Sequence, residues 1–378
     1  MKGTINKALL KRILFIASIV IIVLILLFFT AYATGSAILQ NDFSKDQETI
    51  FADLENANSS ITKIDNIILL IGDGMGFNQI EATKALSGQD SLFMESLPFQ
   101  SQQLTRSLSN KTTDSAAAAT ALASGVKTIN GQVGKVVFSN LKTSMDIAQE
   151  NNMKTGIVTT DDIYGATPAS FSGHALRRNL YNQIISSQLD SNIDYLIASV
   201  VSKDLTSAKS DKIAQKGYTY VDNYEDLLNI DKSNKYYGII PTLHSNYETE
   251  SYVELKDVAQ NAIEYLDNEN GFFLMIEGAR IDKYNHKNNL DGMVSELIDF
   301  DETVEYCVSW AKQHKNTIVI VTADHESGGL EIQKNNFVYT TTGHSSVNVP
   351  LYVYGLNIEK LSYKNTDIFH MCNWAILK

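Results

Sequence analysis

Short apolar runs alternate with helical patterns along the chain after residue 65. The runs are rich in Ile, Leu, Val and Phe and have the length of strands buried on both faces. The segments between them carry apolar residues at near-helical spacing, as helices that cover a sheet do. We therefore expect an α/β fold with a mostly parallel sheet, with strands at Asn66–Ile71, Thr155–Thr160, Phe272–Ile276, Thr317–Thr322 and Pro350–Tyr354, and helices at Ser115–Ala123, Val253–Leu266 and Gly292–Gln313.

The amino-terminal end has a different pattern. Residues Ile13–Phe29 are almost entirely apolar, and four basic residues precede them. Basic residues on that side keep the amino terminus in the cytoplasm, so the rest of the chain is expected outside the cytoplasmic membrane. Extended by Thr30–Ala33, the run nearly spans the ~30 Å hydrocarbon layer, which favours a transmembrane signal anchor. Ala31 and Ala33 also form an A-x-A cleavage signal, so a secreted chain without its leader is the alternative and a buried core helix is a third.

The chain is accordingly divided into three parts. Residues 1–34 are the cytoplasmic tail with the anchor or signal peptide, residues 35–65 are a polar stalk, and residues 66–378 are the globular domain. Between about residues 181 and 250 the alternation weakens and tyrosines crowd together with charged residues. This predicts a variable insertion over the sheet, which either shapes access to a site or only packs as a surface subdomain.

Charge and cysteine content narrow the class of protein. The net charge of −12 becomes −16 once the four positive charges of residues 1–33 are removed, which argues against a nucleic-acid partner. Cys307 and Cys372 are the two cysteines, too few for a disulfide framework, although an extracytoplasmic location would permit one bond. Stability must therefore come from the hydrophobic core.

Acidic and histidine residues follow four of the expected strands. Ligands of open α/β sheets gather at the carboxyl ends of the strands, where loops converge. The four segments that begin there are Ile71–Gly76 with Asp73, Thr159–Asp162, Ile276–Asp282 with Glu277, and Thr322–Glu326 with Asp324 and His325. Repeated placement of this kind indicates a functional site at this edge of the sheet.

The spacing of these residues is suited to a metal. Asp282 and His286 are four residues apart, so on a helical turn both side chains face one ion. Asp324 and His325 add an oxygen and a nitrogen ligand, and His344 adds another imidazole, a combination that favours Zn²⁺ over Ca²⁺. Taken singly, the first pair would be an exposed ion pair and His344 a loop histidine.

Asp114 and Ser115 precede an alanine-rich run that reads as the start of a helix. A structural N-cap explains both residues without any catalytic role. A serine at a helix amino terminus beside a cation is, however, easier to ionise, which would make Ser115 a nucleophile that needs no histidine base. No G-x-S-x-G sequence surrounds Ser115, which disfavours a hydrolase triad.

With these residues assembled, the sequence resembles the alkaline phosphatase family from Asn66 to Gly355. The segments that carry the resemblance, in the family's order, are IGDGMG, TDSAAAATALASG, ATPASFSGHALRRN, EGARIDKYNH, VTADHESGG and TTGHS. The resemblance implies a three-layer sandwich with a central mostly parallel sheet, and a metal-dependent phosphate monoester hydrolase that acts through a phosphoserine intermediate. Small phosphate monoesters would be the substrates, outside the cytoplasmic membrane.

The resemblance also implies a role for each site residue, with Ser115 as nucleophile. One Zn²⁺ would be held by Asp282, His286 and His344, a second by Asp73, Asp324 and His325, and a third ion, usually Mg²⁺, by Asp73, Thr167 and Glu277. Arg178 matches the phosphate-binding arginine, Asp114 the residue that orients it, and Lys283 is a candidate to approach the phosphate or a metal-bound water. The family commonly has Asp or His two residues before Thr167, where this chain has Gly165, so the third ion is in question.

Other functions fit the same residues less well. A phosphodiesterase or phosphotransferase could use the same two-zinc platform, but the TDSA segment and Arg178 favour the monoesterase. A sulfatase is disfavoured because neither C-x-P-x-R nor S-x-P-x-R occurs. A surface protein that binds phosphate or metal without turnover is the remaining alternative. The short span from His325 to His344 leaves monomer and homodimer both open, and the physiological ester and optimum pH are not encoded in any recognisable motif.

Overall fold

The computed structural model describes residues 7–109, 111–136, 139–200, 207–244, 252–334 and 336–378. By its internal contacts the chain divides into two units, Met1–Thr49 and Ile50–Lys378. Helix α1 (Lys7–Ala57) begins in the first unit and ends in the second. The second unit contains all the remaining described elements.

A ten-stranded sheet forms the centre of the second unit, in the order β16-β2-β15-β10-β1-β9-β5-β6-β8-β7. From β10 to β7 neighbouring strands are parallel, whereas β15 is antiparallel to both β10 and β2. Strands β10, β1 and β9, at the centre of the sheet, are buried at every position, as expected for strands covered on both faces. The strand bounds are β1 Asn66–Gly72, β2 Phe99–Leu104, β5 Lys154–Asp162, β6 Tyr195–Val200, β7 Tyr218–Val221, β8 Lys235–Ile239, β9 Phe272–Gly278, β10 Thr317–Thr322, β15 Val349–Tyr354 and β16 Tyr363–Lys364.

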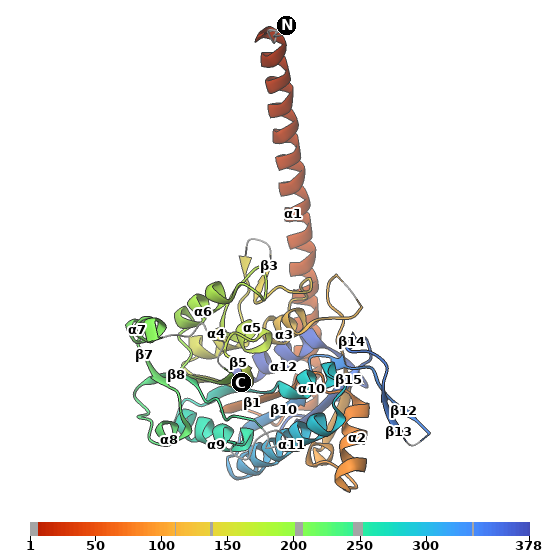
Figure 1. The fold of residues 1–378 in the computed structure, drawn as a ribbon, viewed down its shortest axis with the longest axis vertical. Helices are drawn as coiled ribbons and strands as arrows, with labels where there is room; N and C mark the ends of the chain where they lie inside the picture. Colours follow the sequence, from red (N-terminus) through yellow and green to blue (C-terminus); the bar gives the residue numbers. More distant parts are fainter. Residues whose placement is uncertain (1–6, 110, 137–138, 201–206, 245–251, 335) are drawn as a thin grey trace. The chain divides into compact units, whose positions relative to one another are not determined.

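Helices cover both faces of this sheet and give a three-layer sandwich (Figure 1). One layer contains α2 (Phe77–Ser87), α9 (Leu255–Leu266) and α11 (Leu290–Gln313), and the opposite layer contains α3 (Ser115–Ser124), α4 (Ser144–Glu150), α5 (Ala166–Ser172) and α12 (Asn365–Ile376). The other helical segments are η1 Phe93–Ser96, α6 Tyr181–Asp190, α7 Ser207–Gln215, α8 Tyr224–Leu227 and α10 Arg280–His286. The three-layer fold expected from the sequence is thus confirmed.

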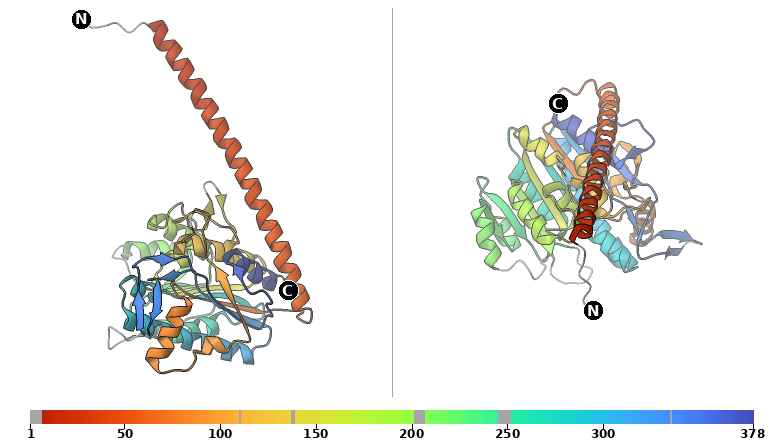
Figure 2. Two further views of the ribbon diagram at one scale, coloured as in Figure 1. Left: turned by 90° about the vertical axis from the view of Figure 1, so that its right-hand side faces the viewer. Right: turned by 90° about the horizontal axis from the view of Figure 1, so that it is seen from above.

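Short strand pairs lie outside the main sheet. A hairpin of β12 (Leu330–Gln333) and β13 (Asn336–Tyr339) projects from the body of the second unit (Figure 2). Strand β11 (Glu326–Ser327), which follows β10 in the chain, pairs with β14 (His344–Ser345). This pairing brings His344 back to the sheet edge. A further pair joins β3 (Lys135–Val136) and β4 (Ser139–Asn140).

The five expected strands and three expected helices all occur, with ends that differ by at most two residues. Residues 181–250, expected to form an insertion over the sheet, are arranged differently. Their described part forms helices α6, α7 and α8 and strands β6, β7 and β8, and these strands extend the sheet at one edge, with Tyr195, Tyr218, Tyr236 and Tyr237 buried. Residues 201–206 and 245–250 of the segment lie outside the described part.

The amino-terminal apolar run is helical. Within α1 the stretch Lys11–Phe28 is long and apolar enough to cross a membrane and is exposed throughout. The segment interpreted as a polar stalk is helical as far as Ala57. Ile50 and Leu54 are buried in the second unit, where Glu55 also pairs with Lys378.

Both cysteines are free and buried, Cys307 in α11 and Cys372 in α12. Burial raises the pKa of both thiols, that of Cys372 to about 12. They act as small apolar core residues, and the single bond that the compartment would permit is not formed. The hydrophobic core therefore holds the fold without a covalent cross-link.

A close approach at the start of β9 supplies a test of this packing. Gly271 has φ +77°, and an added Cβ would lie 1.8 Å from the carbonyl oxygen of Asp65. The same oxygen accepts a hydrogen bond from the Phe272 amide. Gly271→Ala should lower the free energy of unfolding by about 3 kcal/mol or more, because backbone cannot move away as a side chain can. Gly217→Ala is the matched control, since Gly217 has φ +82° and no atom within 4 Å of the added Cβ. Thermal unfolding should show only about 1 kcal/mol lost in the control; equal losses in both variants would contradict the steric explanation.

Candidate metal and phosphate site

The carboxyl ends of the three central strands bring acidic side chains to one edge of the sheet. Asp73 follows β1, Glu277 lies near the end of β9, and Asp324 and His325 follow β10. Because these strands are parallel neighbours in the order β10-β1-β9, their ends meet at the same place. All four side chains are buried.

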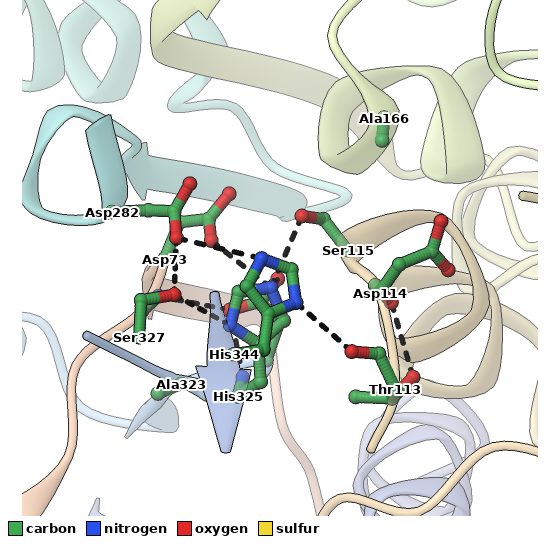
Figure 3. A network of polar contacts seen from close by, with 12 residues as sticks. Asp73, Thr113, Asp114, Ser115, Ala166, Asp282, Ala323, His325, Ser327 and His344 are labelled. Atoms are coloured by element: carbon green, nitrogen blue, oxygen red, sulfur yellow. Dashed lines mark hydrogen bonds and ion pairs between the residues drawn. The ribbon is translucent and has the colours of Figure 1, made fainter. Parts of the chain in front are cut away.

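Helix α3 brings a serine to this edge. Asp114 has an extended backbone and its carboxylate accepts a hydrogen bond from the Ala117 amide at 3.0 Å, so the helix begins at Ser115. Ser115 is 4% exposed, and its Oγ lies 3.2 Å from His325 Nε2. The N-cap interpretation is therefore correct for Asp114, while Ser115 points toward the acidic cluster (Figure 3), where the positive end of the helix favours a negatively charged oxygen.

Asp73, Asp324 and His325 form the first cluster. Their ligand atoms lie within 4.8 Å of one another, and His325 Nε2 is 3.1 Å from Asp324 Oδ2 and 3.5 Å from Asp73 Oδ1. Burial first, and then the neighbouring carboxylates, raise the pKa of Asp73, and burial raises the pKa of Asp324 to about 7. Burial also lowers the pKa of His325, which keeps its imidazole neutral.

Asp282, His286 and His344 form the second cluster. Asp282 and His286 lie on one face of α10, with His286 Nε2 3.2 Å from Asp282 Oδ2, and His344 of β14 places its Nε2 3.1 Å from His286 Nε2. Burial opposes ionisation of Asp282, but its contacts with His286, His325 and Ser327 outweigh burial and lower its pKa. The hydrogen bond to Asp282 raises the pKa of His286 to about 9.

Second partners orient the imidazole rings of this cluster. His286 Nδ1 lies 2.5 Å from the Thr342 carbonyl and His344 Nδ1 lies 2.9 Å from the Thr113 carbonyl, so each Nδ1–H donates to backbone. Both Nε2 atoms are thereby directed at the same point beside Asp282. This arrangement is typical of metal-ligating histidines, whose other nitrogen is fixed by a carbonyl or carboxylate.

Several buried oxygens in the site lack a hydrogen-bond partner within the described residues. They are Asp73 Oδ1, Asp324 Oδ2, Glu277 Oε1 and Thr167 Oγ1. Burial raises the pKa of Glu277 to about 8, and the charge of Asp161 adds to that shift. Unpaired buried carboxylate oxygens are costly, so a set of this kind fits divalent cations, which would replace the missing protons and donors.

Charged groups on the open side of the site fit an anion. Arg178 Nη1 lies 3.4 Å from Asp114 Oδ2, while Asp114 Oδ1 accepts hydrogen bonds from the amides of Ala117 and Gly131. The Arg178 side chain is 43% exposed, so its remaining donors are accessible to a ligand. Lys283 instead makes an ion pair with Asp161.

The structure gathers the residues that the sequence singled out and adds two that it missed. Ser327 donates a hydrogen bond to Asp282 and lies 3.3 Å from His325 Nδ1, so it links the two clusters. Asp161 holds Lys283. Ser327 lies two residues after His325, and Asp161 lies in the acidic end of β5, but neither has a spacing that predicts its contacts.

Sequence comparison agrees with this geometry. A family profile described as alkaline phosphatase matches residues 64–207 and 202–372. Alkaline phosphatase 3 of Bacillus subtilis is 35% identical over 292 residues, which make up 71% of this chain and 63% of that protein. Alkaline phosphatase of Escherichia coli is 31% identical over 327 residues, 69% of each chain.

Structural comparison gives the same result. The alkaline phosphatase from the Antarctic bacterium TAB5 matches with a TM-score of 0.70 and 30% identity, over 82% of this chain and 97% of that chain. The Thermus thermophilus alkaline phosphatase, at 20% identity and a TM-score of 0.74, shares the fold. The chain spans a little under two thirds of the B. subtilis relative. The profile match, these identities and the shared fold show that the chain belongs to the alkaline phosphatase family.

Proposed function

We propose that the chain hydrolyses phosphate monoesters at a two-zinc site, with Ser115 as nucleophile. The observation that carries the proposal is the Ser115 hydroxyl, held at a helix amino terminus and 3.2 Å from His325 between two clusters of carboxylates and imidazoles. A serine in this position needs no histidine base of its own, because cations and the helix terminus favour its ionised form. The family membership supports the same reaction.

The donor atoms fit the expected ions. Nitrogen and carboxylate donors of Asp282, His286 and His344, and of Asp73, Asp324 and His325, suit two Zn²⁺. Oxygen donors of Asp73, Thr167 and Glu277 suit a third ion such as Mg²⁺. Two variants of the TAB5 alkaline phosphatase have Mg bound in the M3 site of that enzyme. When bound, the ions would neutralise negative charge that builds up on the attacking, leaving and phosphoryl oxygens.

The residues of this chain would perform both halves of the reaction. Arg178, oriented by Asp114, binds two phosphoryl oxygens through its planar guanidinium. Ser115 Oγ, having lost its proton, attacks phosphorus; the ester oxygen leaves as the alcohol after taking up a proton, and Ser115 becomes phosphoserine. Water then attacks the same phosphorus, which releases inorganic phosphate and restores the Ser115 hydroxyl. Lys283, beside Asp161, is proposed to approach the bound phosphate.

The same proposal places the reaction outside the cytoplasmic membrane. The apolar helix Lys11–Phe28 would anchor the chain, with the basic residues before it on the cytoplasmic side. Cleavage after the A-x-A sequence would instead release the domain. Amino-terminal sequencing of the membrane and culture-fluid fractions distinguishes the two.

Ser115→Ala tests the nucleophile. Phosphate release from p-nitrophenyl phosphate should fall by at least about 10³-fold, since the covalent route is lost, while zinc content measured by mass spectrometry stays at two per chain. Ser124→Ala is the control. Ser124 lies on the same helix, and its hydroxyl donates to the Thr120 carbonyl and accepts from the Val126 amide. Full activity in Ser115→Ala would sink the mechanism. A diester assayed in parallel tests the alternative phosphodiesterase.

Arg178→Ala tests phosphate binding. Loss of the guanidinium should raise KM and weaken inhibition by inorganic phosphate at least about tenfold, because two charge-assisted hydrogen bonds are removed. The neighbouring Arg177 contacts the Asn130 carbonyl instead, so Arg177→Ala should leave phosphate inhibition within about twofold of the wild type. Steady-state kinetics with and without phosphate measure both. Equal effects of the two substitutions would contradict the assignment.

Metal affinity should depend on pH. Raised pKa values of about 7 for Asp324 and 9 for His286 mean that these two proposed zinc ligands hold protons near pH 6 without metal. Ligands must be deprotonated, so zinc affinity should rise steadily from pH 6 to pH 9, and binding should release protons. Competition with a zinc indicator across this range measures the slope. An affinity that does not change with pH would show that these groups are not ligands.

A further inference from the structure

The space beside Gly165 is filled by a carboxylate from elsewhere on the chain. A Cβ added to Gly165 would lie 2.4 Å from Asp161 Oδ2 and 2.8 Å from Asp161 Cγ. Gly165 has an ordinary negative φ of −48°, so no backbone conformation demands glycine here. The feature that excludes a side chain at position 165 is the position of the Asp161 carboxylate.

An irregularity in β5 directs Asp161 to this place. Thr159 of β5 pairs with Ala198 of β6, and Asp162 pairs with Val200. Two residues of β5 therefore lie between these pairs but only one residue of β6, so β5 has one extra residue. Such a bulge re-aims the side chain that it contains. The amide of Asp161 donates to Thr159 Oγ1 at 2.9 Å, and that hydroxyl donates to Glu277 Oε2.

Asp161 is tied to Glu277 through the residue that joins their strands. Thr159 of β5 is the register partner of Glu277 of β9, and its hydroxyl accepts from the Asp161 amide and donates to Glu277 Oε2. Asp161 Oδ1 pairs with Lys283, which directly follows Asp282 in α10. The Asp161 carboxylate is therefore held between position 165 and the helix that carries Asp282.

Two oxygens in the same corner lack partners. Glu277 is fully buried with Oε1 unpartnered, and the buried Thr167 Oγ1, two residues beyond Gly165, also has no hydrogen bond among the described residues. The Glu277 carboxylate and the Thr167 hydroxyl are oxygen ligands of the kind that Mg²⁺ prefers. The two unpartnered oxygens are an observation separate from the ion pair between Asp161 and Lys283.

We propose that Asp161 supplies the acidic group of the third cation site, and that Gly165 is small because Asp161 occupies the place of a side chain there. The inference rests on the proposed function, since it adds a residue to the same site. The acidic group comes from the strand that precedes position 165, with Asp73, Thr167 and Glu277 as the other oxygens. Lys283 balances the charge of Asp161 and competes with the cation for it.

Calorimetric titration of the zinc-loaded full chain in detergent with MgCl₂ tests the inference without reference to turnover. We expect one Mg²⁺ per wild-type chain and at least tenfold weaker binding in Asp161→Asn, which keeps the shape of the side chain but removes its charge. Lys283→Met should bind Mg²⁺ at least as tightly as the wild type. Asp190→Asn, which breaks the surface pair with Lys216, is the matched control and should bind as the wild type does.

A double substitution tests the shared space. Gly165→Asp by itself should bind Mg²⁺ poorly or unfold more easily because it collides with Asp161, whereas Asp161→Ala with Gly165→Asp should recover affinity to within about threefold of the wild type. The inference is overturned if the wild type binds two zinc ions and releases phosphate but binds no Mg²⁺, or if Asp161→Asn binds Mg²⁺ as tightly as the wild type.

The proposed function is overturned instead if the Mg²⁺ results are as expected but the wild type releases no phosphate.

Discussion

The site depends on buried carboxylates whose negative charge is not balanced, among the described residues, by positively charged side chains in contact with them. Asp73, Glu277 and Asp324 are buried side by side, and burial together with mutual repulsion raises their pKa values. Asp324 accepts from the Gly74 and His325 amides and has the neutral His325 imidazole 3.1 Å away, and none of these groups carries a positive charge. The arrangement is costly without cations, so metal binding would contribute to stability as well as to chemistry.

The fold makes this concentration of charge sustainable by surrounding it with rigid elements. Three parallel strands buried at every position hold Asp73, Glu277 and Asp324 at one edge. Helix α3, in which six of ten residues are alanine, lies against α5 and α12 closely enough to hold Ser115 at that edge. Side chains on strand ends and helix termini are positioned more accurately than side chains on free loops, which suits in-line chemistry at phosphorus.

At Gly165, a side chain from another position occupies the space that a local side chain would fill. A glycine would be interpreted from sequence as the loss of a ligand, because it has no side chain to offer. The bulge in β5 brings Asp161 into that space, and the ion pair with Lys283 holds it there. Sequence positions and spatial positions are therefore not equivalent in this part of the site.

The sequence by itself determined the elements and most of the candidate ligands. Apolar runs of strand length identified β1, β5, β9, β10 and β15, and acidic residues directly after them identified the edge, because side-chain periodicity and strand direction are local properties. It also placed Ser115 at a helix start, since an N-cap followed by alanines is a local signal, whereas the role expected for Ser115 came from the resemblance.

Only the tertiary structure decided which distant groups meet. The tyrosine-rich segment extends the sheet as β6, β8 and β7 because its strands find a free edge, which no local pattern specifies. Ser327 joins the two clusters and Asp161 fills the space beside Gly165 through contacts between residues that are close only after folding. Such contacts follow from strand order, bulges and packing, and these arise from the whole chain rather than from any short segment.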